Sequence, residues 1–538
     1  MAYDISYVRD FTGGENTVSA PDQLLDSQVL AAENVDILLR GGFQKRLGSA
    51  VDGQSFVTDP VRIIPFSYLS GTDRVNKMLY LCADGNMYLG TAPTVVAYAW
   101  GNGYHVDYEV VNNKCYLIGG GKFVVWDGST FAAVTNSETD SNLTTIAKCN
   151  LLEQRGQRLF ASGNPEAPNK LYFSEVGDPT YWKTVSAINA ISDDDDTITA
   201  IKEFFDALVV FKKRSIYAWS GWDPTADVEF NRLAVASGTR AYRTVHYVGD
   251  KLLYLGDDGL YALKGTYKNV IVSERLSNYH TPEFRNIYRP VDVVFTGVTT
   301  KVYDWYNPTH AIVYEGKYLL STVQGASWLW PSNASPPADP LDPRYPYVSN
   351  TDIFVLSLDA LDAGTVQITT YKGWEIAAFA VHPFTGYLLG ARCIDRASYN
   401  PRSLRLFTGY DDEGSAYTMR LKTAPQAQGE PVKRKKYRYG YVWMRQYESG
   451  TSSMDVIAYV DYAEVTNPVE ADESGVWDES VADWDVSKWD FIDLVTRRIS
   501  VKKRGKRVVF EFVDSNKDQP LLVYGLGIEY RTKKPEKT

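Results

Sequence analysis

The chain has 538 residues, 13% of them aromatic, and a formal net charge of −10 with an isoelectric point near 5.2. This length allows roughly two to four domains with cores of their own, so folding requires neither disulfides nor metals. The acidic balance argues against a protein whose main task is to grip nucleic acid, because affinity for phosphate comes largely from clustered Lys and Arg. The aromatic content favours strands over helical bundles.

The cysteines and the N-terminus bear on where the protein is made. Cys82, Cys115, Cys149 and Cys393 lie far apart and form no C-x-x-C pair, so we expect buried free thiols rather than a zinc site or a disulfide framework. The opening MAYDISYVRDFTGG lacks the layout of a signal peptide, and no apolar run reaches the ~18 residues that span a bilayer. We therefore expect synthesis in a cytoplasm and no membrane-spanning segment.

Residues 1–60 differ from the sequence that follows them. Asp4–Phe11 has the pattern of a strand, and LLDSQVLAAENVDILLR, residues 24–40, is compatible with one short helix. We expect this N-terminal segment to contribute to a platform or docking domain.

Residues 61–410 contain a recurring unit, in which an apolar strand, a short polar turn and a second apolar strand follow one another. The clear copies are MLYLCADGNMYLG, NKCYLIGGGKFVVWDG, QRLFASGNPEAPNKLYFSE, DALVVFKKRSIYAWSG and KLLYLGDDGLYALKG. Two looser copies pair GKYLLSTVQG with DIFVLSLD and GYLLGARC with RSLRLFTG. The first strands begin at Met78, Lys114, Arg158, Ala207, Leu252, Lys317 and Tyr387.

The spacing of these copies is typical of a β-propeller. The first four intervals, of 36, 44, 49 and 45 residues, are close to the roughly 40–50 residues of one blade. The last two, of 65 and 70 residues, are longer, partly because of an insertion near residues 326–351 that includes WPSNASPPADPLDPRYPY.

A hairpin on its own would expose its apolar faces to water, so the repeats must stack on one another. Closure of the stack into a ring leaves few exposed strand edges. We therefore expect an all-β fold with a propeller of five to seven blades, complete or incomplete. An open solenoid is the main alternative. The turns Asp84-Gly85 and Asp257-Asp258-Gly259 favour the propeller, because they are typical of antiparallel hairpins.

Residues 411–538 predict a separate C-terminal β-domain, a sandwich or sheet, because the strands become long and strongly alternating. These strands are TMRLKT, RKKYRYGYVWMRQY, SMDVIAYVDY, LVTRRISVKK, RVVFEFV and LLVYGLGIEYRT. Between them GVWDESVADWDVSKWD carries Trp477, Trp484 and Trp489, which we interpret as aromatic residues of a subunit interface, since buried Trp is a common anchor there.

The sequence predicts no catalytic residue, no cofactor and no metal ligand. None of the five histidines stands at a metal-ligand spacing from another. Gly119-Gly120-Gly121 lies inside a predicted hairpin, so we interpret it as a turn rather than a phosphate loop. The run Asp193–Asp196 is interpreted as a solvated loop in preference to a calcium site, because the Gly and distal Glu of an EF-hand are missing. Two carboxylates can also converge from anywhere in a propeller, a pairing that sequence alone does not reveal.

Cations and aromatic residues interleave in VKRKKYRYGYVWMR, from Val432 to Arg445, as they do in proteins that bind nucleic acid. Strand alternation would place Lys433, Lys435, Tyr437 and Tyr439 on one face and Arg434, Lys436, Arg438 and Gly440 on the other. We favour a solvated or subunit-contacting strand over a DNA site.

A family resemblance begins at the N-terminus. Its residues are Phe11, Gly13, Gly14, Pro21, Asn34 and the GGFQKRLGS string ending at Ser49, which contains Arg46 and Gly48. They resemble the opening of the tail nozzle proteins of short-tailed bacteriophages, the family of tail tubular protein B and tail stabilisation proteins. YFSEVGDPTYW, from Tyr172 to Trp182, and the Trp-Asp triplet near the C-terminus extend the resemblance.

The resemblance implies a virion tail protein that forms a homohexameric ring below the portal and contributes to the channel for DNA ejection. Its implied partners are copies of itself, the tail adaptor protein beneath the portal, tail fibres or spikes, and genomic DNA in transit. Propellers would project outward, β-domains would line the channel, and the insertion between Trp328 and Thr351 is the candidate for a plug or gate. A net acidic subunit suits this role, because a conduit should not bind its cargo.

We therefore expect a structural protein and not an enzyme. The alternative is a receptor- or glycan-binding propeller of a virion appendage, which would be monomeric or trimeric. A propeller hydrolase is the third hypothesis.

Overall fold

The structure is a computed structural model. It describes residues 3–56, 60–82, 85–90, 94–95, 100, 106–189, 196–221, 223–225, 229–233, 237–256, 259–266, 269–276, 291–295, 298–302, 309–322, 352–392, 401–429, 431–445, 452–461, 463–471 and 494–532.

The described part of the chain contains a ring of short antiparallel sheets. Six separate sheets have four strands each, and β29–β32 form a seventh four-stranded unit within a larger sheet. The first four units are β7 (Pro60–Ser70), β8 (Asp73–Cys82), β9 (Met87–Leu89) and β10 (Thr94–Val95); β11 (Asp107–Val111), β12 (Lys114–Gly119), β13 (Lys122–Trp126) and β14 (Phe131–Ala133); β15 (Leu151–Arg155), β16 (Arg158–Ser162), β17 (Lys170–Phe173) and β18 (Ala187–Asn189); and β19 (Ile198–Phe204), β20 (Ala207–Lys212), β21 (Ile216–Trp219) and β22 (Asn231–Arg232).

The other three units complete the ring. They are β23 (His246–Val248), β24 (Lys251–Leu255), β25 (Leu260–Thr266) and β26 (Asn269–Leu276); β29 (His310–Tyr314), β30 (Lys317–Thr322), β31 (Asp352–Ser357) and β32 (Ile368–Lys372); and β33 (Ile376–Val381), β34 (Leu388–Arg392), β35 (Arg402–Leu406) and β6 (Ser49–Ser55). All seven strand pairs expected from the repeats are present as antiparallel pairs.

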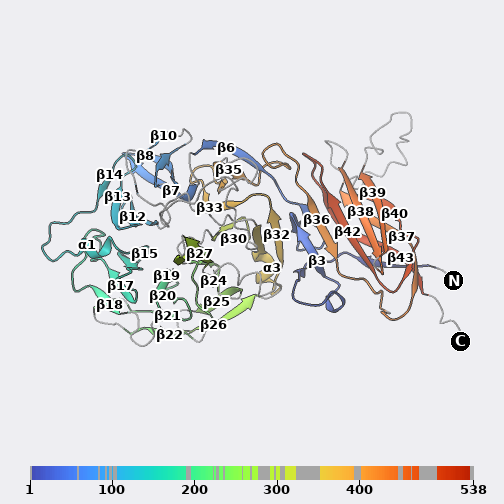
Figure 1. Ribbon diagram of the computed structural model, residues 1–538, viewed down its shortest axis with the longest axis horizontal. Coiled ribbons are helices and arrows are strands. Elements are labelled where there is room, and N and C mark those ends of the chain that lie inside the picture. The colour runs from blue at the N-terminus through green and yellow to red at the C-terminus, as the bar shows by residue number, and fades with distance from the viewer. Residues whose placement is uncertain are drawn as a thin grey trace.

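Neighbouring units share apolar cores, which is why the sheets circle a common axis (Figure 1). Phe66 of the first unit packs 5.0 Å from Trp126 of the second, measured between ring centroids. The same kind of core joins the last unit to the first, where Ala378 and Leu389 pack with Ile63 and Tyr80. The ring is therefore closed. The β-propeller prediction is confirmed, and the open solenoid is wrong.

A strand from the N-terminal segment completes the last unit. β6 pairs antiparallel with β35, with Ser49 opposite Leu406. β6 lies within residues 1–60, before residue 61, at which the sequence predicted that the propeller begins. Its partner stands at the other end of the repeats, so local pattern gives no sign of the pairing.

The helix expected within residues 24–40 is wrong. This stretch forms β3 (Gln28–Glu33) and β4 (Val35–Ile37), and a 3-10 turn, η1 (Pro21–Gln23), precedes it. Val29 and Ala32 of β3 are fully buried in the core of the C-terminal part of the molecule. Tertiary pairing thus overrides the helix-like spacing of the apolar residues.

Two larger sheets pack on each other beside the propeller (Figure 1). The seven-stranded sheet has the order β4, β5 (Phe43–Lys45), β43 (Leu522–Thr532), β37 (Lys435–Arg445) and β40 (Leu494–Ser500), with β1 (Asp4–Val8) on β43 and β41 (Arg504–Gly505) on β37. The ten-stranded sheet runs from β29–β32 through β3, β36 (Met419–Thr423), β42 (Val508–Asp514) and β38 (Ser452–Val460) to β39 (Ala463–Ala471), and β2 (Gly14–Glu15) pairs with β3. Strands from both ends of the chain therefore build this two-sheet domain.

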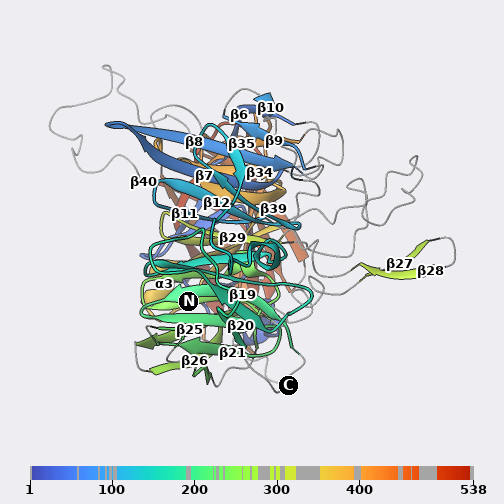
Figure 2. The ribbon, with the colours of Figure 1, turned by 90° about the vertical axis from the view of Figure 1, so that its left-hand side faces the viewer.

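Short elements lie between the strands. The hairpin of β27 (Val291–Phe295) and β28 (Val298–Val302) falls between the fifth and sixth units and stands away from the ring in Figure 2. The helices α1 (Leu143–Ile146) and α3 (Leu358–Asp362) and the 3-10 turn η2 (Tyr242–Thr244) are short. The helices that the structure describes have three to five residues, too few to cross a membrane.

Candidate functional site

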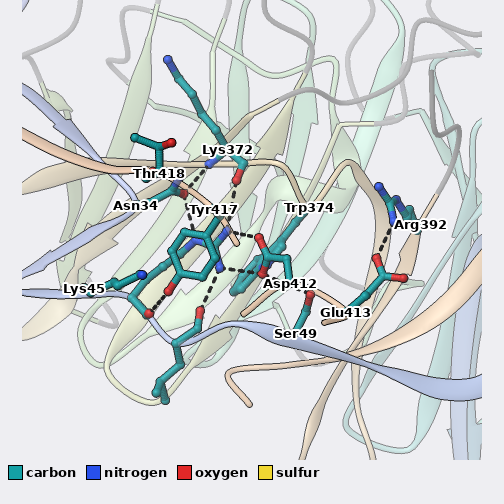
Figure 3. Close-up of polar contacts among 12 residues, drawn as sticks. Asn34, Lys45, Ser49, Lys372, Trp374, Arg392, Asp412, Glu413, Tyr417 and Thr418 are labelled. Carbon is teal, nitrogen blue, oxygen red and sulfur yellow. Dashed lines mark hydrogen bonds and ion pairs between the residues drawn. The ribbon is translucent and has the colours of Figure 1, made fainter. Parts of the chain in front are cut away.

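A buried ion pair joins the propeller to the two-sheet domain (Figure 3). Arg46 follows β5 and its side chain is fully buried. Its Nη1 donates to Oδ1 of Asp412 at 3.0 Å and its Nη2 donates to Oδ2 of Asp412 at 2.6 Å. Nη2 also donates to the carbonyl oxygen of Lys372, the last residue of β32, at 3.1 Å. This two-point geometry requires the planar fork of arginine.

Aromatic rings enclose the Arg46 guanidinium. Its carbon lies 3.9 Å from the ring centroid of Tyr417 and 4.4 Å from that of Trp374. The Tyr417 hydroxyl donates to the carbonyl oxygen of Arg46, and Trp374 Nε1 donates to Oδ1 of Asp412 at 2.9 Å. The charge is thus removed from water but is held by a carboxylate, a carbonyl and two ring faces, which together offset its desolvation.

Asn34 ties three segments together in the same network. Its Oδ1 accepts hydrogen bonds from Arg46 Nε and from the backbone N–H of Lys372, both at 2.8 Å. Its Nδ2 donates to the carbonyl oxygen of Thr418 at 2.7 Å. Asn34 has a φ of 55°, a left-handed conformation that asparagine tolerates better than most residues. We name the network of Asn34, Arg46, Lys372, Asp412 and Tyr417 the junction.

Gly48 lies close to the loop that follows β35, beside the junction. A Cβ atom at this position would lie 1.8 Å from the carbonyl oxygen of Asp411, so a side chain cannot be accommodated without a backbone shift. A second buried pair lies nearby, where Lys45 Nζ is 2.9 Å from Oδ2 of Asp514, with both side chains almost fully buried.

The other residues of the N-terminal resemblance lie in the two-sheet domain. Phe11 is fully buried, and its ring centroid is 5.5 Å from that of Phe43. The N–H of Gly13 donates to the carbonyl oxygen of Ser27, and Gly14 begins β2 with a φ of 65°. Pro21 begins η1 and is exposed. Six of the seven residues are therefore buried within one subunit, and three of them, Asn34, Arg46 and Gly48, lie in or beside the junction.

The second candidate site is a cavity of about 330 Å³ on the propeller axis. Residues from the first strands of the units and from η2 line it. The ionisable ones are Arg62, Asp107, Tyr108, Glu109, Glu153, Lys202, Tyr242, Arg243, His246 and His310.

Oppositely charged side chains in the cavity form two ion pairs. Lys202 Nζ lies 2.7 Å from Oε2 of Glu153, and Arg62 Nη2 lies 3.2 Å from Oδ1 of Asp107. The other oxygen of Glu153, Oε1, accepts a hydrogen bond from the backbone N–H of Glu203 at 2.9 Å. Burial, and then the neighbouring Glu153 carboxylate, raise the pKa of Glu109 to about 8, so this carboxyl group carries a proton at neutral pH.

The two cavity histidines are neutral at pH 7. Burial lowers the pKa of His246 to about 4 and also lowers the pKa of His310 well below its ordinary value, with the Arg62 and Arg243 charges acting in the same direction on His310. His310 Nδ1 accepts a hydrogen bond from the N–H of Phe379 at 2.8 Å.

This arrangement differs from the carboxylate pairs of glycosidases. Those carboxyl groups stand about 5–9.5 Å apart, so that a sugar or water fits between them. The Glu153 carboxylate is not left open in this way, because both of its oxygens accept hydrogen bonds within the protein, from Lys202 Nζ and from the N–H of Glu203. The sequence did not single out either residue, because Glu109 on β11 and Glu153 on β15 each stand one strand before the repeat that the sequence shows.

The remaining sequence candidates lie elsewhere. Gly119 pairs with Lys122 across a tight turn, as expected. Asp196 accepts hydrogen bonds from the N–H groups of Thr197 and Arg214, whereas residues 193–195 lie outside the described residues. In the part of the chain that the structure describes, no cluster of His, Cys, Asp and Glu is suited to hold a metal ion.

Trp477, Trp484 and Trp489 and the insertion near 326–351 lie outside the described residues. In β37 the simple alternation is broken by a bulge between Tyr437 and Gly440, so Lys435 and Tyr437 are buried and the later buried residues are Gly440, Val442 and Met444.

The chain matches no family model and no curated protein. Among solved structures it is similar to PorZ of Porphyromonas gingivalis, a surface component of the type-IX secretion system, with 10% identity, a TM-score of 0.37 and coverage of 73% of this chain and 44% of PorZ. It is also similar to the Pan2 WD40 domain of Neurospora crassa, with 9% identity, a TM-score of 0.36 and coverage of 68% and 97%. The chain thus spans less than half of PorZ. At these scores the matches carry no argument about function.

Proposed function

We propose that this chain is a structural subunit of a phage tail nozzle, which forms a ring below the portal and adaptor and contributes to the conduit for DNA. The observation that carries the proposal is the junction. Asn34, Arg46 and Gly48, which stand in the N-terminal resemblance to nozzle proteins, lie where the propeller meets the two-sheet domain.

The junction supports a scaffolding role because it fixes the angle between the two parts of the subunit. In a closed ring every copy makes the same contacts, so an error in that angle would be repeated at each interface. A buried two-point ion pair with additional hydrogen bonds restricts this angle more tightly than an apolar contact, which has no preferred direction.

The size of the axial cavity supports the proposal that the DNA passes between subunits and not through a single propeller. Its volume of about 330 Å³ is far too small for a DNA duplex, whose major groove alone is about 12 Å wide. In this proposal the acidic balance of the chain keeps phosphate contacts few along the route of the DNA.

The test is to image virions made from the genome that encodes this chain, with an antibody or a fused tag marking it. We expect the label on the tail axis directly below the portal vertex. A label at the tips of fibres or spikes, or virions that lack the chain, would refute the nozzle assignment.

The second candidate function is receptor or glycan binding by the propeller. It is favoured by the cavity, which places charged groups next to Tyr108 and Tyr242 and could orient a small polar ligand. A glycan array probed with the full chain tests it. This function would be favoured over the nozzle if the wild-type chain bound a glycan, Lys202→Ala abolished that binding, and the wild-type chain formed no ring.

A further inference from the structure

The seven-stranded sheet has one face on the core and one face directed away from it. Val442 and Met444 of β37 and Leu526 and Ile528 of β43 are buried in that core. The side chains that alternate with them lie on the opposite side, which we name the outer face. It comprises Tyr3, Ile5, Tyr7, Arg9, Arg438, Tyr439, Tyr441, Trp443, Arg498, Gly525, Gly527, Glu529 and Arg531.

Guanidinium groups and aromatic rings alternate across the outer face. At one end the Arg9 guanidinium lies 4.8 Å from the ring centroid of Tyr7 and 5.1 Å from that of Trp443. The rings of Tyr7 and Trp443 are themselves 5.6 Å apart. At the other end the Tyr439 ring lies between two cations, with Arg438 at 4.9 Å and Arg498 at 4.5 Å.

Two glycines of β43, Gly525 and Gly527, let side chains of the outer face lie directly on the backbone of the sheet. A Cβ atom on Gly527 would lie 2.8 Å from Cη2 of Trp443, so the indole rests directly on the backbone. The rings are therefore fixed in position before any partner arrives, which lowers the entropy lost on binding.

The outer face is cationic in an acidic chain. It carries Arg9, Arg438, Arg498 and Arg531, and its carboxylate, Glu529, is 7% exposed and accepts hydrogen bonds from Arg438 and Tyr441. Arg438 is 49% exposed and Tyr7 is 56% exposed. Trp, Tyr and Arg are the residues most enriched at the centres of protein interfaces.

One stretch of this chain has the complementary chemistry. Residues 472–493, between β39 and β40, contain eight carboxylates, one lysine and the three tryptophans. Indole faces suit guanidinium groups, and carboxylates suit the same groups through two-point hydrogen bonds.

We propose that the outer face binds the acidic segment 472–493 of a second copy of this chain. The proposal rests on the proposed function, because a face on one copy and a segment on the next form a head-to-tail contact, the kind that closes into a ring. A single-stranded nucleic acid is the competing occupant. It is disfavoured because the rings that would stack on bases are already in contact with arginines.

The experiment uses two charge-reversed forms of the full chain. The first carries Arg9→Glu and Arg498→Glu, which reverse the outer face and leave the Arg438–Glu529 pair in place. The second carries Asp483→Arg and Asp485→Arg in the segment. A control carries Arg74→Glu and Lys114→Glu, which make the same charge change on exposed residues of the propeller. Circular dichroism confirms folding, and mass photometry at several concentrations measures assembly.

Each charge-reversed form alone should be monomeric at a concentration at least tenfold above that at which the wild-type chain and the control assemble. An equimolar mixture should assemble again, because each reversed face then meets a reversed segment. Assembly of either form alone, or failure of the mixture to assemble, would overturn the proposal. The proposal would also be overturned if the wild-type chain bound a labelled single-stranded oligonucleotide and the Arg9→Glu and Arg498→Glu form lost that binding but still assembled. If the wild-type chain itself never assembles, the proposed function fails as well.

Discussion

Arg46 and Asp412 are 366 residues apart in the chain and form a two-point ion pair of 3.0 and 2.6 Å. The contact joins the segment before the propeller to the segment after it. The propeller and the two-sheet domain are thus held together by side chains that meet only when both ends of the chain have folded.

Replacing Arg46 should destabilise the whole molecule. Arg46→Ala leaves the Asp412 carboxylate without its cation, and removing one partner of a buried pair costs about 3–5 kcal/mol. Arg46→Lys keeps the positive charge but lacks the planar two-point geometry of the guanidinium, so its loss of unfolding free energy should be smaller than that of Arg46→Ala. Urea unfolding measures both.

The matched control is Lys148→Ala, which breaks the exposed pair with Glu166. That loss should stay below about 1 kcal/mol. An Arg46→Ala variant as stable as this control would show that the junction does not hold the two parts together.

Gly48→Ala should destabilise the folded chain more than Gly121→Ala does. The added methyl would lie 1.8 Å from the Asp411 carbonyl oxygen, and the backbone shift it forces should cost about 3 kcal/mol or more. Gly121 has a left-handed φ of 78° but a side chain there would face open space, so Gly121→Ala should cost about 1–2 kcal/mol of stability. Equal midpoints of thermal unfolding for the two variants would contradict the close approach.

The cavity carboxyl pair predicts a pH dependence of stability. The pKa of Glu109 is higher in the folded state than its ordinary value of 4.5, so the folded state holds a proton that the unfolded state has lost. The free energy of unfolding therefore falls as the pH rises toward about 8. The lowered pKa of His246 acts oppositely, but only between about 4 and 6.5.

Between pH 7 and 8.5 the Glu109 effect should thus dominate in the cavity. Glu109→Gln keeps a neutral side chain and should flatten the fall in stability over that interval, as measured by urea unfolding at pH 7.0, 7.75 and 8.5. Identical slopes for the wild-type chain and Glu109→Gln would show that the carboxyl group is already ionised at pH 7.

The propeller was predictable from sequence because each hairpin is local. The strands β12 and β13 are joined by Gly120 and Gly121, and their pairing follows from that turn and from the apolar runs on both sides. The pairing of β6 with β35 was not predictable, because no local feature of residues 49–55 indicates so distant a partner. The same reason explains the wrong helix, since β3 pairs with β36, a strand that follows all of the repeats.

The candidate site was predictable in part. Asn34, Arg46 and Gly48 were identified by resemblance. Their partners Asp412 and Tyr417 were not, because the loop after the repeats that contains them carries no recognisable motif. Glu109 and Glu153 were missed because 66 acidic residues are present and only three-dimensional closure selects which of them face the axis.

In our proposal, copies of this chain assemble with one another into a closed ring. The most direct test is the mass of the purified full-length chain, alone and with its adaptor ring, measured by native mass spectrometry. We expect a closed species with a mass near six times 60.4 kDa. A monomer or a trimer under both conditions would contradict the proposal.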